Sequence, residues 1–268
     1  MSQVVLITGG SSGIGKAVGI YLKEQGFTVY GTSRNPARFD ATFPIKLVSL
    51  DVTDSKSILA CVAEILKIEG RLDVLVNNAG VGITGPIEET PTSEISKAFA
   101  TNVYGPIEMI NAVLPAMREQ NSGTIINISS IAGYMGLPYR GVYSATKGAL
   151  ELLTEAYRME VKQFGIRMTN VAPGDFATNI AAGRYHAPVI EDSPYKQAYG
   201  DTLKMMDAHV DAGEDPLAMA KVIYAIIKSD SPKIHYKVGA PLQKFSIILK
   251  RLLPDKMYER ILMKHYKL

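Results

Sequence analysis

The feature that most constrains this chain is a glycine-rich turn that directly follows a short apolar run. The turn is Thr8-Gly9-Gly10-Ser11-Ser12-Gly13-Ile14-Gly15, between an expected buried strand at residues 3–7 and an expected helix at residues 13–25. Glycines allow main-chain amides to approach a pyrophosphate, which then lies at the positive end of the helix. The sequence therefore predicts a strand, turn and helix that hold a dinucleotide.

Strands and helices alternate after this turn. Further strands are expected at residues 27–32, 45–50 and 73–76, and a helix at residues 55–69 ends at Gly70, a typical left-handed helix stop. The strands are nearly continuous apolar runs, as in parallel sheets that helices cover. We therefore predict an α/β fold: a single doubly wound parallel sheet of the Rossmann type, with helices on both faces and a C-terminal helical extension. Ligands of such sheets bind at the carboxyl ends of the strands.

The end of the second strand predicts which dinucleotide binds. NAD-selective sites usually end this strand with a carboxylate for the adenosine ribose, and this chain has none there. Arg34 stands just beyond the strand instead, with Ser11, Ser33 and Asn35 as candidate hydrogen-bonding neighbours. A planar guanidinium suits a phosphate monoester, so we predict NADP(H) as the cofactor. The alternative is that Arg34 is a solvated loop cation.

A tyrosine and a lysine four residues apart are the main candidates for catalysis. Tyr143 and Lys147 lie in the helical pattern of residues 142–163 and therefore share a helix face. A cation ~4 Å from a phenol, at an effective dielectric constant of ~20, favours phenolate by roughly 4 kcal/mol, on the order of three pKa units. A tyrosine that ordinarily titrates near ~10 would then exchange protons near neutral pH.

The same spacing occurs a second time, at Tyr224 and Lys228, so the spacing alone is weak evidence. The neighbourhoods of the two pairs differ. Ser130 precedes Tyr143 by thirteen residues and ends a strand-like run, whereas an aspartate stands thirteen residues before Tyr224. We interpret Tyr224 and Lys228 as part of an ordinary amphipathic helix.

These motifs, in this order, resemble the short-chain dehydrogenase/reductase family. The matching segments are TGGSSGIG at residues 8–15, DVTD at 51–54, NNAG at 77–80, YSATK at 143–147 and PG at 173–174, with Asn102, Ser130 and Thr178. The resemblance covers roughly residues 1–180 and implies that Asn102, Ser130, Tyr143 and Lys147 form a catalytic tetrad. With the reasoning above, it gives this set of cofactor-binding residues: Gly9, Ser11, Ser12, Gly13, Ile14, Gly15, Ser33, Arg34, Asp51, Val52, Asn78, Ala79, Gly80, Tyr143, Lys147, Pro173, Gly174 and Thr178.

The resemblance implies a role for each tetrad member in hydride transfer between a nicotinamide and a carbonyl or alcohol carbon. Tyr143 exchanges a proton with the substrate oxygen, and Ser130 hydrogen-bonds that oxygen. Lys147 lowers the pKa of Tyr143 and holds the nicotinamide ribose, while Asn102 supports a water that returns protons to Lys147. The alternative for Asn102 is a helix residue satisfied by neighbouring backbone. Phe176 departs from the smaller branched aliphatic residue expected beside the nicotinamide.

Residues 175–213 are expected to form a long substrate loop, because they show little periodicity. Apolar side chains from this loop and from the segment before Tyr143 predict a large apolar ketone or alcohol, steroid-, retinoid- or lipid-like, over a small hydroxy acid. The alternative is that they only pack the loop on the body. They are Phe176, Ile180, Tyr185, Val189, Ile190, Tyr195, Tyr199, Met205, Met206, Tyr134, Met135, Leu137 and Tyr139.

Residues 241–268 are expected to form a basic amphipathic tail of two helical runs, packed on or near a catalytic domain at residues 1–240. Residues 237–268 carry eight Lys and Arg against two acidic residues, a net charge of +6, which leaves −3 for residues 1–236. Such a tail can cover the substrate pocket, form a subunit contact or lie on an anionic membrane. The C-terminal pattern also resembles, more loosely, the branch that includes 17β-hydroxysteroid and retinol dehydrogenases.

The composition bears on the expected cell compartment, on disulfides and on metal binding. The apolar run next to Met1 lacks the form of a secretion signal, and no apolar run reaches the ~20 residues of a membrane span. The single cysteine, Cys61, excludes an internal disulfide and is expected to be a buried thiol. The four histidines show no metal-ligand spacing, so no metal is expected. We therefore expect a cytoplasmic protein, peripheral at a membrane surface if the tail binds lipid.

An NADP(H)-dependent carbonyl reductase or alcohol dehydrogenase is the leading functional hypothesis. The alternative is a non-enzymatic NADPH-binding sensor or membrane-associated scaffold, since fold does not fix function. The glycine spacing disfavours a sugar-nucleotide epimerase, and beyond the basic tail nothing supports nucleic-acid binding. Helices at residues 93–117 and 142–163 resemble those of the family's common four-helix dimer contact, so we expect a homodimer or homotetramer.

Overall fold

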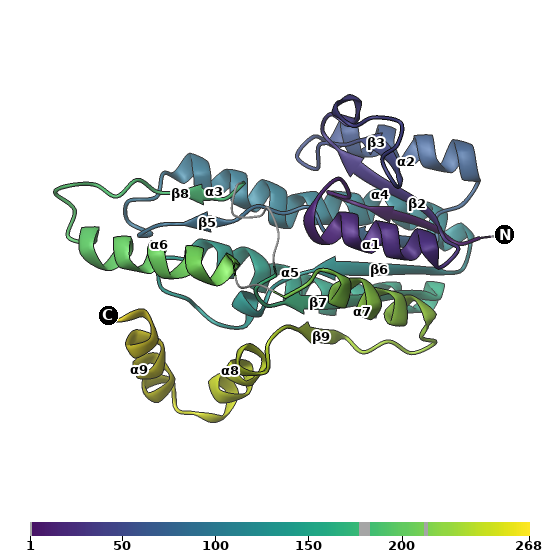
Figure 1. The fold of residues 1–268 in the computed structure, drawn as a ribbon. Helices are drawn as coiled ribbons and strands as arrows, with labels where there is room; N and C mark the ends of the chain where they lie inside the picture. The colour runs from purple at the N-terminus through teal and green to yellow at the C-terminus, as the bar shows by residue number, and fades with distance from the viewer. Residues whose placement is uncertain (1, 177–182, 212–213) are drawn as a thin grey trace.

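The computed structural model describes residues 2–176, 183–211 and 214–268 and is built on a seven-stranded parallel sheet (Figure 1). The order of strands across the sheet is β3 (Lys46–Ser49), β2 (Thr28–Ser33), β1 (Val4–Ile7), β4 (Val74–Asn77), β6 (Gly123–Ile128), β7 (Ile166–Pro173) and β9 (His235–Val238). The chain moves outward from β1 in one direction and from β4 in the other, so the predicted doubly wound sheet is confirmed. The reversal between β1 and β4 makes the carboxyl ends of these strands the expected ligand edge.

Alternate residues of each strand supply the two layers of core. From β1, Val4 and Leu6 pack against α2 (Ser55–Glu69) and α4 (Gly105–Glu119), and α5 (Gly141–Val161) covers the same face. Val5 and Ile7 pack against α1 (Gly13–Glu24) and α7 (Leu217–Lys228) on the other face. Cys61 is buried within the first layer, and burial raises the pKa of its thiol to about 12. Helices therefore cover both faces, as predicted.

The prediction of one continuous helix at residues 93–117 is wrong in the middle of that segment. The segment divides into α3 (Thr92–Phe99), a π-helical turn (Ala100–Tyr104) and α4. The sequence contains the physical reason, because Pro106 has no N–H to donate to the carbonyl of Asn102 four residues earlier. Gly105 N–H instead bonds the Ala100 carbonyl, five residues back. Single-turn π segments often occur at functional sites.

The long loop expected at residues 175–213 contains regular structure. The short strand β8 (Tyr185–His186) pairs in parallel with β5 (Ile83–Thr84), and α6 (Lys196–Asp211) follows. The face that α6 buries carries Tyr199, Thr202 and Met206, so a polar threonine interrupts its apolar periodicity and hides the helix from pattern analysis. The Tyr199 hydroxyl donates to the Ala187 carbonyl at 2.8 Å, which fixes α6 to β8.

Two further helices, α8 (Pro241–Leu252) and α9 (Asp255–Tyr266), form the predicted C-terminal extension. They follow β9 and lie together at one side of the molecule (Figure 1). Ile247 of α8 and Tyr258 of α9 are buried against Ile131 and Met135, in the segment that follows β6. That segment includes a 3₁₀ turn (Ile131–Tyr134), and shorter 3₁₀ turns occur at Pro36–Arg38 and Lys162–Phe164.

Replacing Gly70 by alanine is expected to lower the free energy of unfolding by about 1 kcal/mol, because an L-residue is strained in the left-handed region. Gly70 ends α2 with a φ of 67°, and a Cβ placed there meets no atom within 4 Å, so the strain would lie in the backbone. Gly136→Ala is the matched control, since its Cβ also enters open space but its φ is not positive. Equal urea midpoints for the two variants would contradict this prediction.

Candidate active site

The turn between β1 and α1 has a backbone that favours glycine. Gly9 and Gly13 have φ values of 65° and 52°. A Cβ on Gly15 would come 2.5 Å from the Gly9 carbonyl oxygen and 2.5 Å from Asn78 Nδ2, so the turn folds closely on itself. Ser12 stands at the N-cap of α1, and its side chain makes no capping hydrogen bond. The first amides of α1 therefore have no cap from the Ser12 side chain, and the turn fits the pyrophosphate of a dinucleotide.

Thr8 and the segment after β4 hold this turn against the neighbouring strand. The Thr8 hydroxyl accepts hydrogen bonds from the N–H groups of Asn78 and Ala79, at 3.0 and 2.9 Å. Asn78 Nδ2 in turn donates to the Thr8 carbonyl at 2.9 Å. The structure thus joins the predicted cofactor residues of the first and fourth strands at one edge of the sheet, with Ser11 in the same turn.

The ends of β2 and β3 bring Arg34 and Asp51 together. Arg34 is exposed, and its charge contributes to lowering the pKa of Asp51, although hydrogen bonds from Thr53 have the larger effect. Beside Arg34, Ser33 Oγ accepts from the N–H of Asn35 at 3.2 Å. The site therefore offers a cation at the position where the sequence analysis expects a phosphate monoester. The side chain of Val52, another predicted cofactor residue, does not face this site, because it is buried in the core beneath α4.

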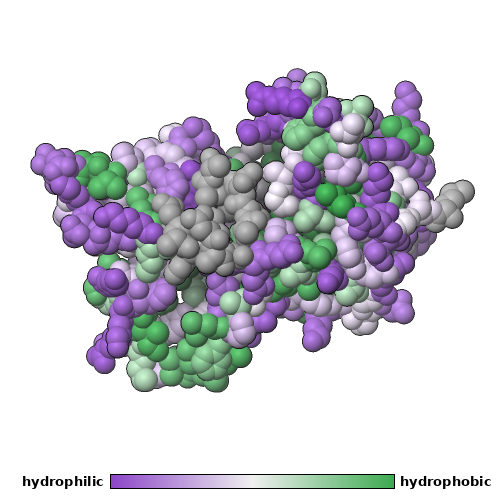
Figure 2. Space-filling view, viewed as in Figure 1, coloured by the Kyte–Doolittle hydropathy of each residue, from purple (hydrophilic) through white to green (hydrophobic). Residues whose placement is uncertain are grey.

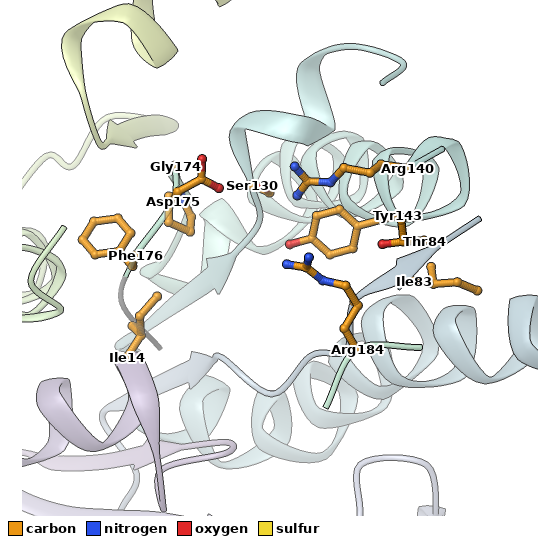
Figure 3. A pocket seen from close by; sticks show the side chains of 12 residues that line it. Ile14, Ile83, Thr84, Ser130, Arg140, Tyr143, Gly174, Asp175, Phe176 and Arg184 are labelled. Atoms are coloured by element: carbon orange, nitrogen blue, oxygen red, sulfur yellow. The ribbon is translucent and has the colours of Figure 1, made fainter. Parts of the chain in front are cut away.

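One pocket brings the candidate catalytic hydroxyls together with the cofactor turn (Figure 3). Ser130 and Tyr143 line it, and so do three predicted cofactor residues, Ile14, Pro173 and Gly174. Ser130 caps the 3₁₀ turn after β6, where its Oγ accepts from the N–H of Ala132 at 3.1 Å. The predicted cofactor residue Thr178 lies outside the described residues.

Close backbone packing sets the position of Ser130 relative to α5. A Cβ on Gly133 would come 2.9 Å from the main-chain carbon of Lys147, and one on Gly148 would come 3.1 Å from the Gly133 carbonyl oxygen. A larger residue at either glycine would therefore push the Ser130 turn away from the helix that carries Tyr143.

Lys147 lies behind Tyr143 and is buried. Its Nζ donates to the carbonyl of Ile128, the last residue of β6, at 2.9 Å and lies 5.9 Å from the centre of the Tyr143 ring. Burial lowers the pKa of Lys147, and the charges of Tyr143 and Glu151 oppose that effect. The second Tyr-x-x-x-Lys pair has the same 5.9 Å separation, but Lys228 is exposed on α7. Burial, rather than spacing, distinguishes the two lysines.

Asn102 is fully buried in the π-helical turn. Its Oδ1 accepts from the N–H of Val81 at 2.8 Å, and its Nδ2 donates to the Val81 carbonyl at 2.9 Å and to Thr146 Oγ1 at 3.1 Å. The side chain is thus bonded to neighbouring backbone, the arrangement considered as the alternative in the sequence analysis. Gly80 lies beside it: a Cβ there would come 3.2 Å from Asn102 Oδ1 and 3.4 Å from Lys147 Nζ. Asn102 therefore helps to define the surroundings of the ammonium group.

Sequence analysis did not find the charged residues that line the pocket. Arg140, Arg184 and Asp175 contribute to it, and Figure 3 shows the two guanidinium groups on either side of Tyr143. The Arg140 guanidinium carbon lies 5.5 Å from the centre of the Tyr143 ring. Arg140 stands one helical turn before Tyr143, which is a usable signal, whereas only the pairing of β5 with β8 brings Arg184 here.

The expected apolar wall is correct only in part. Ile14, Ile83 and Phe176 are apolar and line the pocket. Among the described residues of the expected wall, only Phe176 does so, and it also packs in the core layer beside α7. The others pack elsewhere or face solvent: Tyr199 fixes α6, whereas Val189 and Ile190 are exposed. Ile180 lies outside the described residues.

Comparison with known proteins agrees with this geometry. Residues 3–188 match the family model described as short chain dehydrogenase. A 3-ketodihydrosphingosine reductase of Bacteroides thetaiotaomicron is 40% identical over 258 residues, which cover 96% of this chain and 95% of that protein. The 17-beta-hydroxysteroid dehydrogenase type 1 of Mus musculus is 33% identical over 251 residues, which cover 87% of this chain and 72% of that protein.

Two solved structures resemble the fold of this chain. A short-chain dehydrogenase from Streptomyces avermitilis superposes with a TM-score of 0.83 at 34% identity, covering 100% of this chain and 96% of that one. ElxO with NADP bound superposes with a TM-score of 0.71 at 32% identity, covering 89% of this chain and 97% of that one.

The buried state of Lys147 predicts a pH-dependent contribution to stability. Its folded pKa lies below the ordinary value of 10.5, so in the window between the two values the unfolded chain binds a proton that the folded chain does not. Stability contributed by Lys147 therefore rises with pH across this window. The difference in unfolding free energy between the wild type and Lys147→Met, wild type minus variant, should increase as the pH rises through this window towards 10.5 in urea titrations. Lys228→Met is the control, and the same slope for both variants would contradict the prediction.

Proposed function

The chain belongs to the short-chain dehydrogenase/reductase family, and we propose that it is an NADP(H)-dependent enzyme acting on a bulky, lipid-like ketone or alcohol. Members of this family oxidise or reduce carbonyl and hydroxyl groups with a nicotinamide cofactor. The family resemblance, including the looser one to the hydroxysteroid dehydrogenase branch, is confirmed. The observation that carries the proposal is the shared pocket of Ser130, Tyr143 and the cofactor residues Ile14 and Pro173.

The chemistry assigned to this pocket is proton transfer at the substrate oxygen. The bound cofactor supplies or accepts the hydride. Tyr143 donates a proton to the oxygen during reduction and accepts it during oxidation. Ser130 donates a hydrogen bond to the same oxygen, which holds the carbonyl in place and stabilises its developing negative charge. The Lys147 ammonium stabilises the charge that remains on Tyr143 and holds the nicotinamide ribose.

Asn102 supports this proposal as a positioning residue. Its side-chain amide is bonded to Val81 and Thr146, so it holds the π-helical turn against the segment after β4. Its main-chain carbonyl lacks the usual helical donor because Pro106 has no N–H. We propose that this carbonyl holds the water that returns a proton to Lys147. In the sequence analysis, this role was assigned to Asn102 without naming the atom.

NADP(H) is the proposed form of the cofactor. An adenosine phosphate would meet the exposed guanidinium of Arg34, with Ser33 beside it and Asp51 near the adenine. The NADP-bound ElxO structure, at 32% identity, supports this choice. The pyrophosphate would be held by amides between Ser11 and Gly15, since the Gly9 N–H already donates to Thr32 Oγ1 at 3.0 Å.

The proposed substrate has an apolar body and polar groups near the reacting carbon. Ile14, Ile83 and Phe176 offer apolar contacts, and Arg140 and Arg184 offer hydrogen-bond donors beside Tyr143. The two relatives named for a ketodihydrosphingosine and a hydroxysteroid support a lipid-like ketone.

A homodimer or homotetramer is the proposed assembly. Leu152 and Met159 are 68% and 72% exposed and lie seven residues apart, hence on one side of α5. Two exposed apolar side chains on one helix face favour a contact between copies of the chain through α5.

Tyr143→Phe is expected to lower turnover by about a thousandfold or more, because it removes the proton donor and leaves the ring. NADPH affinity should stay near that of the wild type. Tyr224→Phe is the matched control: Tyr224 precedes a lysine by the same spacing, and its replacement should leave turnover unchanged. Steady-state oxidation of NADPH with a panel of apolar ketones measures the effect. Retention of turnover within about tenfold would remove Tyr143 from proton transfer.

Arg34→Ala is expected to weaken NADPH binding by about 10- to 100-fold and to leave NADH binding unchanged, because it removes a charged partner of the phosphate. Arg38→Ala removes a neighbouring exposed cation and is the control. Fluorescence titration of each protein with both cofactors measures the two affinities. Preference of the wild type for NADH would show that the reading of the second strand's end is wrong, without affecting the assignment of Tyr143.

A further inference from the structure

The two C-terminal helices carry apolar side chains on a side that the other described residues leave exposed. We define the tail surface as Leu242, Phe245, Ile248 and Leu252 of α8 with Met257 and Ile261 of α9; these side chains are 45% to 77% exposed. In Figure 2 hydrophobic atoms gather over the region of α8 and α9 at the lower edge of the molecule. Contiguous exposed apolar residues on a folded chain mark an interaction site.

The helical periodicity of α8 explains why these residues remain exposed. An amphipathic helix that only packs on its own protein buries one apolar stripe and presents polar residues to solvent. Helix α8 buries Ile247 towards Ile131 and Met135. Leu242, Phe245 and Leu252 recur at spacings of three and seven residues, so they form a second stripe on another side of the helix. This second apolar stripe does not contribute to packing α8 against the catalytic domain.

The charge of the tail identifies the class of partner. Residues 237–268 have a net charge of +6, whereas residues 1–236 have a net charge of −3. Arg251, Lys256, Arg260 and Lys264 are exposed on the same two helices as the tail surface. Apolar residues flanked by cations suit the interface of an anionic bilayer, where the apolar side chains enter the acyl boundary and the cations meet lipid phosphates. A second copy would bring like charges together.

The helices that carry the tail surface also border the proposed active site. Gln243 Nε2 on α8 donates to Asp175 Oδ2 at 2.7 Å, and Asp175 lines the pocket. On α9, Tyr266 is buried; burial raises its pKa, and the positive charge of Arg140, another pocket residue, opposes the rise. The inner side of α8 therefore contacts a lining residue of the pocket, and α9 buries Tyr266 near another, while the other sides of both helices are exposed.

We propose that the tail surface docks this chain peripherally on an anionic lipid bilayer, with α8 and α9 lying between the bilayer and the pocket residue Asp175. In the described parts of the chain, each helix is too short or too polar to cross a bilayer. The proposed contact is therefore with the surface of the bilayer. Delivery of substrate from the bilayer rests on the proposed function, whereas docking itself does not.

Vesicle sedimentation tests the docking. The full chain is mixed with vesicles of pure phosphatidylcholine and with vesicles of an equimolar mixture with phosphatidylglycerol, at low and at physiological salt. We expect pelleting with the anionic vesicles, stronger at low salt because ions screen the cations. Phe245→Asp combined with Leu252→Asp should weaken binding by about tenfold or more, since both changes place charge in the acyl boundary.

Leu59→Asp combined with Ile68→Asp is the matched control, because these apolar residues are also exposed, at 61% and 57%, but lie on α2. The control should pellet like the wild type, and reduction of a short, water-soluble ketone by all three proteins should be equal. No pelleting in either salt, or equal pelleting of both variants, would overturn the proposal while leaving the enzymatic function intact. Dissociation of an oligomer by the tail variant, seen by analytical ultracentrifugation without lipid, would show a second copy on the tail surface and would also overturn it.

Discussion

The buried ammonium of Lys147 is the interaction on which the rest of the site depends. Removing a cation from water is costly unless nearby groups replace the lost hydration. The Ile128 carbonyl at 2.9 Å provides one such group, so α5 must dock where β6 ends. The Glu151 carboxylate, one turn further along α5, provides a compensating charge. This requirement fixes the helix relative to the sheet, and with it the position of Tyr143.

Glu151 is itself buried, and a buried carboxylate also needs hydrogen-bonding partners. It accepts from the hydroxyls of Ser129 and Tyr134, from Asn170 Nδ2 at 3.2 Å, and it lies 2.6 Å from His235 Nδ1. Burial, reinforced by Glu151, raises the pKa of Tyr134. These partners come from β7, β9 and the turn after β6. The polar interior behind the active site is therefore one connected network that joins the second half of the sheet to α5.

The sequence predicted those parts of the molecule that depend on local chemistry. The glycine turn, the parallel strands and the left-handed stop at Gly70 each require particular residues at adjacent positions, and the structure has them. The pocket lining depended on contacts that no local pattern encodes. Arg184 reaches Tyr143 only through the pairing of β5 with β8, and Gln243 reaches Asp175 across 68 positions. The division of the helix at Asn102 was predictable in principle, because Gly105-Pro106 removes a helical donor.

The two ends of the site differ in how firmly they are held, and this difference bears on how substrate enters. The cofactor end is braced by main-chain contacts such as that of the Gly15 position with the Gly9 carbonyl oxygen, inside a sheet that helices cover on both faces. Helices α8 and α9 lie beside the pocket, where Gln243 of α8 contacts the lining residue Asp175, and the buried side chains of the two helices are Ile247, Tyr258 and Tyr266. Segments with few buried apolar contacts open at lower free energy than core elements. We therefore expect the contact of Gln243 with Asp175 to open at lower free energy than the main-chain contacts of the cofactor turn.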